Sequence, residues 1–104
     1  MSFQIGSNLL DACVLSVLKK EDAYGYKLTQ ELRSVMNVSE STLYPVLRRL
    51  VTKGFLETYD KEYMGRNRRY YHLTAQGIVE HEKNLKEWDM FSKKIDTLLK
   101  EGFQ

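Results

Sequence analysis

Apolar residues recur at three- and four-residue spacing through the first third of the chain, a pattern that predicts two amphipathic helices. The first predicted helix covers Asn8 to Lys19, with Ser7 or Asn8 as its capping residue. Its apolar positions are Leu9, Leu10, Cys13, Val14, Val17 and Leu18. The second predicted helix follows a polar, glycine-containing segment at 21–25 and ends near Met36. Its apolar positions are Tyr24, Leu28, Leu32 and either Val35 or Met36.

A third helix is predicted after a short turn at Asn37. Its apolar stripe is formed by Leu43, Leu47 and Leu50. The candidate capping residues are Ser39, Ser41 and Thr42. Pro45 favours Ser41 or Thr42, because the missing proline N–H costs nothing within the first helical turn. A start at Ser39 would instead leave one hydrogen bond unmade and bend the helix slightly near Ser41. Gly54 is placed to end the helix in the left-handed conformation.

Two segments with period-two spacing follow the third helix and predict a β-hairpin. They are residues 55–59 and 68–73, joined by a long turn at 60–67 that contains Gly65. Tyr71 and Leu73 are expected to pack toward the third helix. A helix followed by such a ribbon indicates a winged helix-turn-helix over residues 1–73, mainly α with a small β-hairpin.

A long final helix is predicted from a cap at Thr74 to about Leu99 within a second unit, residues 74–104. Its apolar stripe comprises Ile78, Leu85, Trp88, Phe91, Ser92, Ile95, Leu98 and Leu99. Because the stripe is longer than a small core needs, we expect it to pack against a second copy in a twofold dimer. The alternative is that the helix folds back on its own domain. The dimer and effector residues expected here are Phe3, Ile5, Leu85, Trp88, Phe91, Ser92, Ile95 and Leu99.

The formal net charge of +2 conceals an uneven distribution along the chain. Residues 45–72 hold seven Lys or Arg against three acidic residues, a local excess of four, whereas the segments on either side each carry a net charge of minus one. Such concentration predicts a surface that binds a polyanion, with a solvated run of charges as the alternative.

The positions opposite the buried stripe of the third helix are the predicted groove-facing residues. They are Ser41, Tyr44, Arg48 and Thr52. For Tyr44 the alternative is packing under the hairpin, and Arg49, beside the stripe, should brace the fold or meet a phosphate. Hairpin arginines suit phosphates or the minor groove. The full predicted DNA-binding set is Ser39, Ser41, Thr42, Tyr44, Arg48, Arg49, Lys53, Arg66, Asn67, Arg68, Arg69 and Tyr70.

Three motifs together give the chain a family resemblance: AYGYKLTQEL, TLYPVLRRLVTKGFL and GRNRRYYHLT. In that order and spacing they resemble the PadR family of winged-helix transcriptional regulators, and most of all its shorter members with a single C-terminal dimerisation helix. The resemblance implies that Tyr44, Pro45, Arg49 and Leu50 belong to the recognition-helix signature, and that Gly65, Arg66, Arg69 and Tyr70 belong to the wing. Family members usually carry glycine where this chain has Ser41, so the contact at that position is open.

Catalytic and metal chemistry are not indicated. The chain contains no GxSxG, GxxxxGK[ST] or HExxH motif, and Cys13 is far in sequence from His72 and His81. His72 is interpreted as a strand residue, His81 as a helix-surface residue and Cys13 as core. We therefore expect no enzyme activity, cofactor or metal. A cytoplasmic protein without a membrane segment is expected, because no uncharged run reaches about 18 residues.

Taken together, the sequence predicts a homodimeric, sequence-specific regulator that binds double-stranded operator DNA. A repressor is favoured over an activator, because the chain has no room for a polymerase-recruiting domain. A winged-helix module that docks a protein and a single-strand binder are the alternatives. Trp88 and Phe91 could form an aromatic slot at the twofold axis, and the family resemblance implies aromatic or lipophilic effectors; the alternative is that Trp88 only fills the interface.

Overall fold

The computed structural model describes residues 7–101, with four α-helices, a three-stranded antiparallel sheet and a π-helical turn. The elements are α1 (Ser7–Lys20), β1 (Ala23–Tyr24), α2 (Gly25–Arg33), α3 (Glu40–Thr52), β2 (Leu56–Tyr63), β3 (Arg66–Leu73), α4 (Ala75–Asp96) and η1 (Thr97–Glu101). The fold is thus the predicted winged helix-turn-helix with a long C-terminal helix. The side chains of Ser7 and Asn8 and the predicted interface residues Phe3 and Ile5 lie outside the part that is described.

The core lies where α1, α2 and α3 meet the inner face of the sheet. Its buried apolar residues are Val14, Leu15, Leu18, Ala23, Leu28, Leu32, Val38, Leu43, Val46, Leu47, Leu50, Leu56, Tyr71 and Leu73. Cys13 is half-buried and packs against this cluster. The predicted inward positions of α3 and the inward Tyr71 and Leu73 of the hairpin are therefore confirmed.

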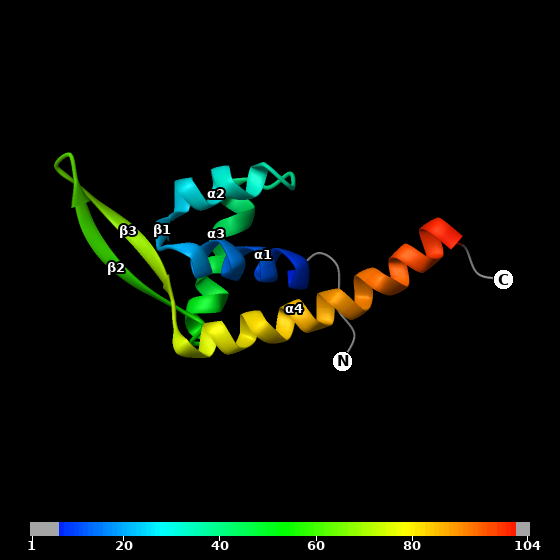
Figure 1. Cartoon of the computed structure of the whole chain (residues 1–104). Helices are drawn as coiled ribbons and strands as arrows, with labels where there is room; N and C mark the ends of the chain where they lie inside the picture. Colours follow the sequence, from blue (N-terminus) through cyan, green and yellow to red (C-terminus); the bar gives the residue numbers. More distant parts are fainter. Residues whose placement is uncertain (1–6, 102–104) are drawn as a thin grey trace.

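The sheet order is β1-β3-β2, and the hairpin of β2 and β3 projects from the helices as the wing (Figure 1). Figure 1 also shows α4 running beneath α1 and then extending, with η1, beyond the rest of the described fold. Thr74 caps α4 as predicted, since its hydroxyl accepts a hydrogen bond from the Gly77 N–H at 3.0 Å.

Both predicted boundaries of the second helix are wrong. The second helix ends at Arg33 rather than Met36, and Val35 is 73% exposed. The chain forms no further helical turn after Arg33. The Arg33 side chain instead donates a hydrogen bond from Nε to the Val38 carbonyl oxygen at 3.0 Å, in the segment that follows the helix. Tyr24 lies in β1, paired with Tyr70, and not in the helix. The sequence does not predict strand β1, because its two residues are too few to show a periodic pattern of apolar positions.

The cap of α3 is Ser39, not Ser41 or Thr42. Its hydroxyl accepts from the Thr42 N–H at 3.3 Å, and this cap places Pro45 beyond the first turn of the helix. Gly54 has the predicted left-handed conformation, with φ 85°.

The wing turn is also shorter than predicted. Instead of a loop at 60–67, the strands continue to Tyr63 and from Arg66, and only Met64 and Gly65 form the turn. Both have positive φ, 50° and 80°, the backbone form of a tight type I′ hairpin turn. The polar residues at 60–63 concealed the strand, because neither of their faces is buried there.

Candidate nucleic-acid interface

The outward face of α3 is continuous and polar, as the sequence predicts. Ser41, Thr42, Tyr44, Arg48 and Thr52 are all exposed. Thr52 donates its hydroxyl hydrogen to the Arg48 carbonyl at 3.0 Å, which keeps the end of the face in the helix. Arg48 thereby presents a guanidinium group on a rigid element, at the centre of this face.

At the start of α3, three hydroxyl groups form one cluster. The hydroxyl of Ser39 lies 3.0 Å from that of Ser41 and 3.1 Å from that of Thr42. Ser39 is thus engaged in capping the helix, while Ser41 and Thr42 remain exposed beside it. The serine that stands at 41 instead of glycine therefore joins a cap network.

Tyr44 is exposed but not isolated. Its ring lies against the start of α2, so close that a Cβ atom added at Gly25 would come 2.7 Å from the Tyr44 hydroxyl oxygen. Because Gly25 has no side chain, the Tyr44 ring can pack against the start of α2 while it remains partly exposed to solvent.

Arg49 forms an ion pair with Asp11 and so links α3 to α1. Of the two alternatives for Arg49, the structure shows the brace. Lys53 is exposed at the C-terminal cap of the helix, beside the base of the wing.

The strand register divides the predicted wing residues between two faces of the hairpin. Asn67 and Arg69 share the face of the buried Tyr71 and Leu73, which is the face turned toward the helices. Arg69 lies 3.6 Å from Asp60 across the strands, an exposed pair that contributes little to stability. The opposite, outer face of the hairpin carries Arg66, Arg68 and Tyr70.

Aromatic rings cover much of that outer face. Tyr70 stacks on Tyr59, with ring centroids 5.5 Å apart, and meets Tyr24 edge-on at 5.5 Å. The guanidinium carbon of Arg68 lies 4.2 Å from the Tyr24 ring centroid and 3.9 Å from that of Tyr63. Arg68 and Tyr70 are among the residues predicted from the sequence, whereas their partners Tyr24, Tyr59 and Tyr63 are not. Because 59 and 63 differ by an even number, their common face could have been found had the strand been recognised.

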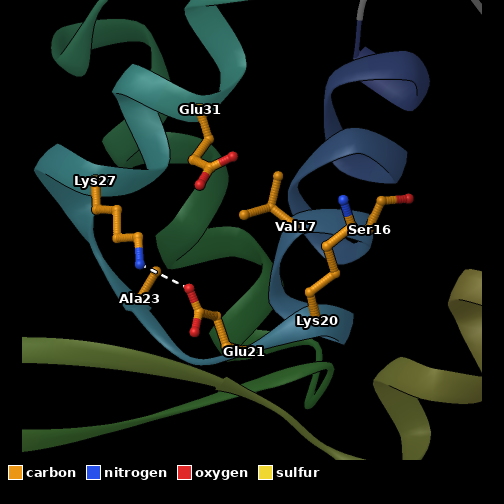
Figure 2. A pocket seen from close by; sticks show the side chains of 7 residues that line it. All are labelled: Ser16, Val17, Lys20, Glu21, Ala23, Lys27 and Glu31. Atoms are coloured by element: carbon orange, nitrogen blue, oxygen red, sulfur yellow. Dashed lines mark hydrogen bonds and ion pairs between the residues drawn. The ribbon is translucent and has the colours of Figure 1, made fainter.

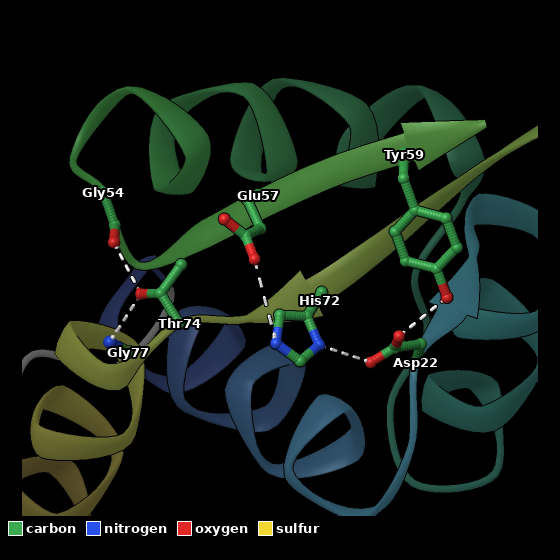
Figure 3. Close-up of polar contacts among 7 residues, drawn as sticks. All are labelled: Asp22, Gly54, Glu57, Tyr59, His72, Thr74 and Gly77. Atoms are coloured by element: carbon green, nitrogen blue, oxygen red, sulfur yellow. Dashed lines mark hydrogen bonds and ion pairs between the residues drawn. The ribbon is translucent and has the colours of Figure 1, made fainter.

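A polar network fixes the base of the wing (Figure 3). The Asp22 carboxylate accepts from the Tyr59 hydroxyl at 2.7 Å and lies 2.8 Å from Nδ1 of His72, whose Nε2 is 3.9 Å from Glu57. Burial alone would raise the pKa of Asp22, but the bonds from Tyr59 and His72 outweigh it and lower this pKa. The same hydrogen bond to Asp22 raises the pKa of Tyr59 to about 12. His72 is thus a strand residue, as predicted.

The close-up in Figure 3 also shows how the wing joins α4. The Thr74 hydroxyl donates to the Gly54 carbonyl at 2.6 Å while it accepts from the N–H of Gly77. A single side chain therefore connects the end of α3 to the start of α4.

An open groove of about 530 Å³ is lined by residues of α1, of α4 and of the end of α2 and the turn that follows it. Its lining includes Cys13, Ser16, His81, Leu85 and Trp88. Leu85 and Trp88 are 53% and 41% exposed, and the Trp88 and Phe91 ring centroids lie 6.2 Å apart. Of the other predicted interface residues, Ser92 and Ile95 are half-buried and Leu99 is exposed in η1.

His81 is buried in this groove, which corrects its interpretation as a surface residue. Its Nε2 lies 2.8 Å from the Ser16 hydroxyl oxygen, and its Nδ1 has no hydrogen-bond partner within the described chain. Burial and then the charge of Lys19 lower the pKa of His81, against a small opposing effect of Glu82. Burial likewise raises the pKa of the Cys13 thiol, which therefore has little thiolate character.

A smaller depression of about 120 Å³ lies between α1 and α2 (Figure 2). Lys27 points across it to Glu21, with 2.7 Å between the ammonium nitrogen and the carboxylate oxygen. This hydrogen bond lowers the pKa of Glu21 and raises that of Lys27. Because these charges compensate each other, we assign no binding role to the depression.

Within residues 7–101, no group of three His, Cys, Asp or Glu side chains is arranged to hold a metal ion. None of the described helices combines the length and apolar character needed to cross a bilayer. What distinguishes the structure is an exposed α3 face, flanked by an arginine-bearing wing, on a winged helix-turn-helix domain.

Comparison with known proteins assigns this domain to a family. Residues 14–83 match the Transcriptional regulator PadR-like family, so the chain belongs to the PadR-like transcriptional regulators and not to the enzymes. Transcriptional regulator Rv3488 of Mycobacterium tuberculosis (strain ATCC 25618 / H37Rv) is 40% identical over 70 residues, or 64% of this chain and 65% of that protein.

Solved structures agree with this assignment. The crystal structure of smu.1704 from Streptococcus mutans UA159 has a TM-score of 0.88 and 35% identity, and the match covers 100% of this chain and 98% of that one. Bacillus subtilis PadR, crystallised in complex with operator DNA, has a TM-score of 0.69 over 74% of this chain and 46% of its own. At 24% identity, that second likeness shows the shared fold alone.

Proposed function

We propose that this regulator binds double-stranded DNA in a sequence-specific manner, as a homodimer that represses transcription. The observation that carries the proposal is the exposed α3 face centred on Arg48, beside a wing whose arginines provide the local positive excess. Bacillus subtilis PadR, which has the same fold, was crystallised with operator DNA, and this supports placing α3 in the major groove.

The side chains divide into base-reading and backbone-contacting roles. Arg48 is proposed to read a base edge, with Ser41, Thr42 and Tyr44 around it. Phosphate contacts come from charged and polar groups on the periphery of α3 and along the wing, which set orientation without reading sequence. These are Lys53, Arg66, Asn67 and Arg69. Arg49 and Ser39 are proposed to act indirectly, because the first pairs with Asp11 and the second caps α3.

Dimerisation is proposed to occur through α4. Leu85, Trp88 and Leu99 leave apolar surface exposed on a helix that extends beyond the fold (Figure 1), which would cost free energy in water unless covered. A second copy related by a twofold axis would bury it and set two α3 helices on the half-sites of a palindrome, roughly 34 to 36 Å apart.

A repressing role is proposed because occlusion of a promoter needs only tight binding to DNA, which the exposed α3 face and the wing would provide. An aromatic or lipophilic effector is proposed to act at Trp88, by favouring a dimer whose α3 helices no longer match the operator spacing. Titration of aromatic compounds into protein that has been shown separately to bind DNA should quench tryptophan fluorescence. Absence of quenching across such a panel would remove the effector proposal.

The decisive test of DNA binding is the salt dependence of affinity. If the dimer neutralises about eight phosphates, log affinity should fall with log salt at a slope of about minus seven. A slope near zero would contradict DNA binding and favour a module that docks a protein.

Single-strand binding is disfavoured, since the Tyr59 and Tyr70 ring faces are stacked on each other.

A single variant then tests the reading role of α3. Arg48→Ala should lose roughly 1 to 3 kcal/mol of discrimination at one base pair in a selection from random duplexes. Lys83→Ala, on the exposed surface of α4, is the matched loss of charge and should leave the consensus unchanged. Equal weakening on all sequences for Arg48→Ala would make Arg48 a backbone contact.

A further inference from the structure

The side chain of Arg68 connects the distal part of the wing to the body of the protein. It lies between two rings, with its guanidinium carbon 4.2 Å from the Tyr24 centroid and 3.9 Å from the Tyr63 centroid. Tyr24 belongs to β1, directly before α2, whereas Tyr63 is the last residue of β2 before the wing turn. Arg68 is half-buried as a result, unlike the exposed Arg66 and Arg69.

This contact continues through further rings to the base of the wing. Tyr24 meets Tyr70 edge-on, Tyr70 stacks on Tyr59, and the hydroxyl of Tyr59 donates to Asp22 at 2.7 Å. The outer face of the sheet is therefore a connected row of rings that reaches the loop after α1 and ends at the guanidinium of Arg68.

The distal wing needs such a brace because it has only two strands. The third strand, β1, pairs with β3 at Tyr70 and Tyr71 only, so the hairpin beyond residue 70 toward the tip has backbone bonds to one neighbour. Isolated two-stranded hairpins are marginally stable in water. Arg68 lies two residues beyond Tyr70, toward the wing tip, where β1 no longer pairs with β3. Its two cation–π contacts supply the stabilisation that a third strand would otherwise give there.

We propose that Arg68 is a positioning residue: stacked between Tyr24 and Tyr63, it fixes the direction of the wing so that Arg66 and its neighbours reach DNA in register. This inference rests on the proposed DNA binding for its consequence but not for the brace itself. The planar guanidinium matters here because it lies over two aromatic rings at once, and a planar group stacks on rings in a way that the tetrahedral ammonium of lysine cannot match.

The brace is tested first in the free protein. In Arg68→Ala and in Tyr63→Leu, ¹⁵N relaxation should show increased motion of the amides of Gly65 and Arg66, with order parameters falling from roughly 0.85 toward 0.6. Arg66→Ala removes a neighbouring charge and Tyr63→Phe keeps the ring, so in the free protein both should keep the order parameters of the unchanged wing. Unaltered order in both Arg68→Ala and Tyr63→Leu would overturn the proposal.

Duplex binding provides the second arm. Tyr63→Leu removes no charge, yet it should weaken DNA binding by about tenfold, as Arg68→Ala should, and the double variant should be no weaker than Arg68→Ala alone. Weakening by Arg68→Ala with wild-type affinity for Tyr63→Leu would show that Arg68 contacts a phosphate directly, and would contradict the positioning role. If no variant and no wild-type protein binds duplexes, the proposed function fails, while the relaxation data still decide the brace.

Discussion

Met64, at the tip of the wing, has a backbone conformation that its side chain does not favour. Its φ is 50°, and the side chain is 86% exposed, so no packing compensates for the conformation. The first position of a type I′ turn prefers asparagine, aspartate or glycine. Met64→Asn should therefore raise the free energy of unfolding by about 0.5 kcal/mol in urea denaturation. Met64→Val, with a β-branched side chain, should lower it, and equal stability of the two variants would contradict this assignment of the turn.

His81 is a buried residue whose protonation should make the stability of the fold depend on pH. Its pKa is lowered below the ordinary 6.5 by burial, so the folded protein resists a proton that the unfolded chain accepts. The stabilisation is complete above pH 6.5 and is lost as pH falls from there through the lowered pKa. The advantage of the wild type over His81→Gln in free energy of unfolding should thus shrink between pH 8 and pH 5. A difference that stays constant over that range would show that His81 does not titrate in this way.

At the level of elements, Gly77 decides how closely α4 approaches the wing. A Cβ atom there would lie 2.2 Å from the Phe55 carbonyl oxygen and 2.5 Å from a Leu73 methyl. That carbonyl also accepts from the Thr74 N–H at 3.1 Å, so it cannot move away without loss. Although alanine favours a helix by about 1 kcal/mol, Gly77→Ala should destabilise the protein by roughly 1 to 3 kcal/mol in urea denaturation.

The control for this substitution is Glu82→Ala, on the exposed surface of the same helix. It should change the free energy of unfolding by less than about 0.5 kcal/mol. If Gly77→Ala proves as mild as Glu82→Ala, the close contact between α4 and the segment after α3 is not present in solution.

The elements that the sequence predicted well are those with a buried stripe. Leu43, Leu47 and Leu50 locate α3, and Thr74 locates the start of α4, because local spacing and a side-chain cap are readable along the chain. The start of α3 is predicted two or three residues too late because Pro45 favours a cap at Ser41 or Thr42, whereas the Ser39 hydroxyl caps the helix in the structure. A proline in the second turn is tolerated at the loss of one backbone hydrogen bond.

The candidate site was less readable from sequence, because it depends on contacts between distant residues. Spacing identified the exposed face of α3 and the arginines of the wing. It did not reveal that Arg49 meets Asp11, nor that Arg68 lies between Tyr24 and Tyr63. Asp11 is 38 positions from Arg49, and Tyr24 and Tyr63 are 44 and 5 positions from Arg68. Such pairs can be identified only when the positions of α1 and β1 and the strand register are known.

For the whole molecule, affinity for a palindrome is expected to depend on the apolar surface of α4. Leu85 and Trp88 are three residues apart on one helical face and both line the groove beside α1. Introducing a charge by Leu85→Glu would place a carboxylate in the proposed interface, where desolvation opposes it. Leu85→Glu should therefore shift sedimentation equilibrium from dimer to monomer without unfolding the winged domain, since Leu85 lies outside the buried core.

Loss of the proposed dimer should have a calculable effect on DNA binding. When one half-site is bound, the second α3 helix is held near its own half-site at high effective concentration, which raises affinity by roughly 10² or more. The monomeric variant should lose about that factor on a palindromic duplex and almost none on a single half-site. Lys83→Ala, exposed on the same helix, should keep the dimer and both affinities. A Leu85→Glu protein that remains dimeric, or that loses equally on both duplexes, would mean that α4 does not form the interface that pairs the two reading helices.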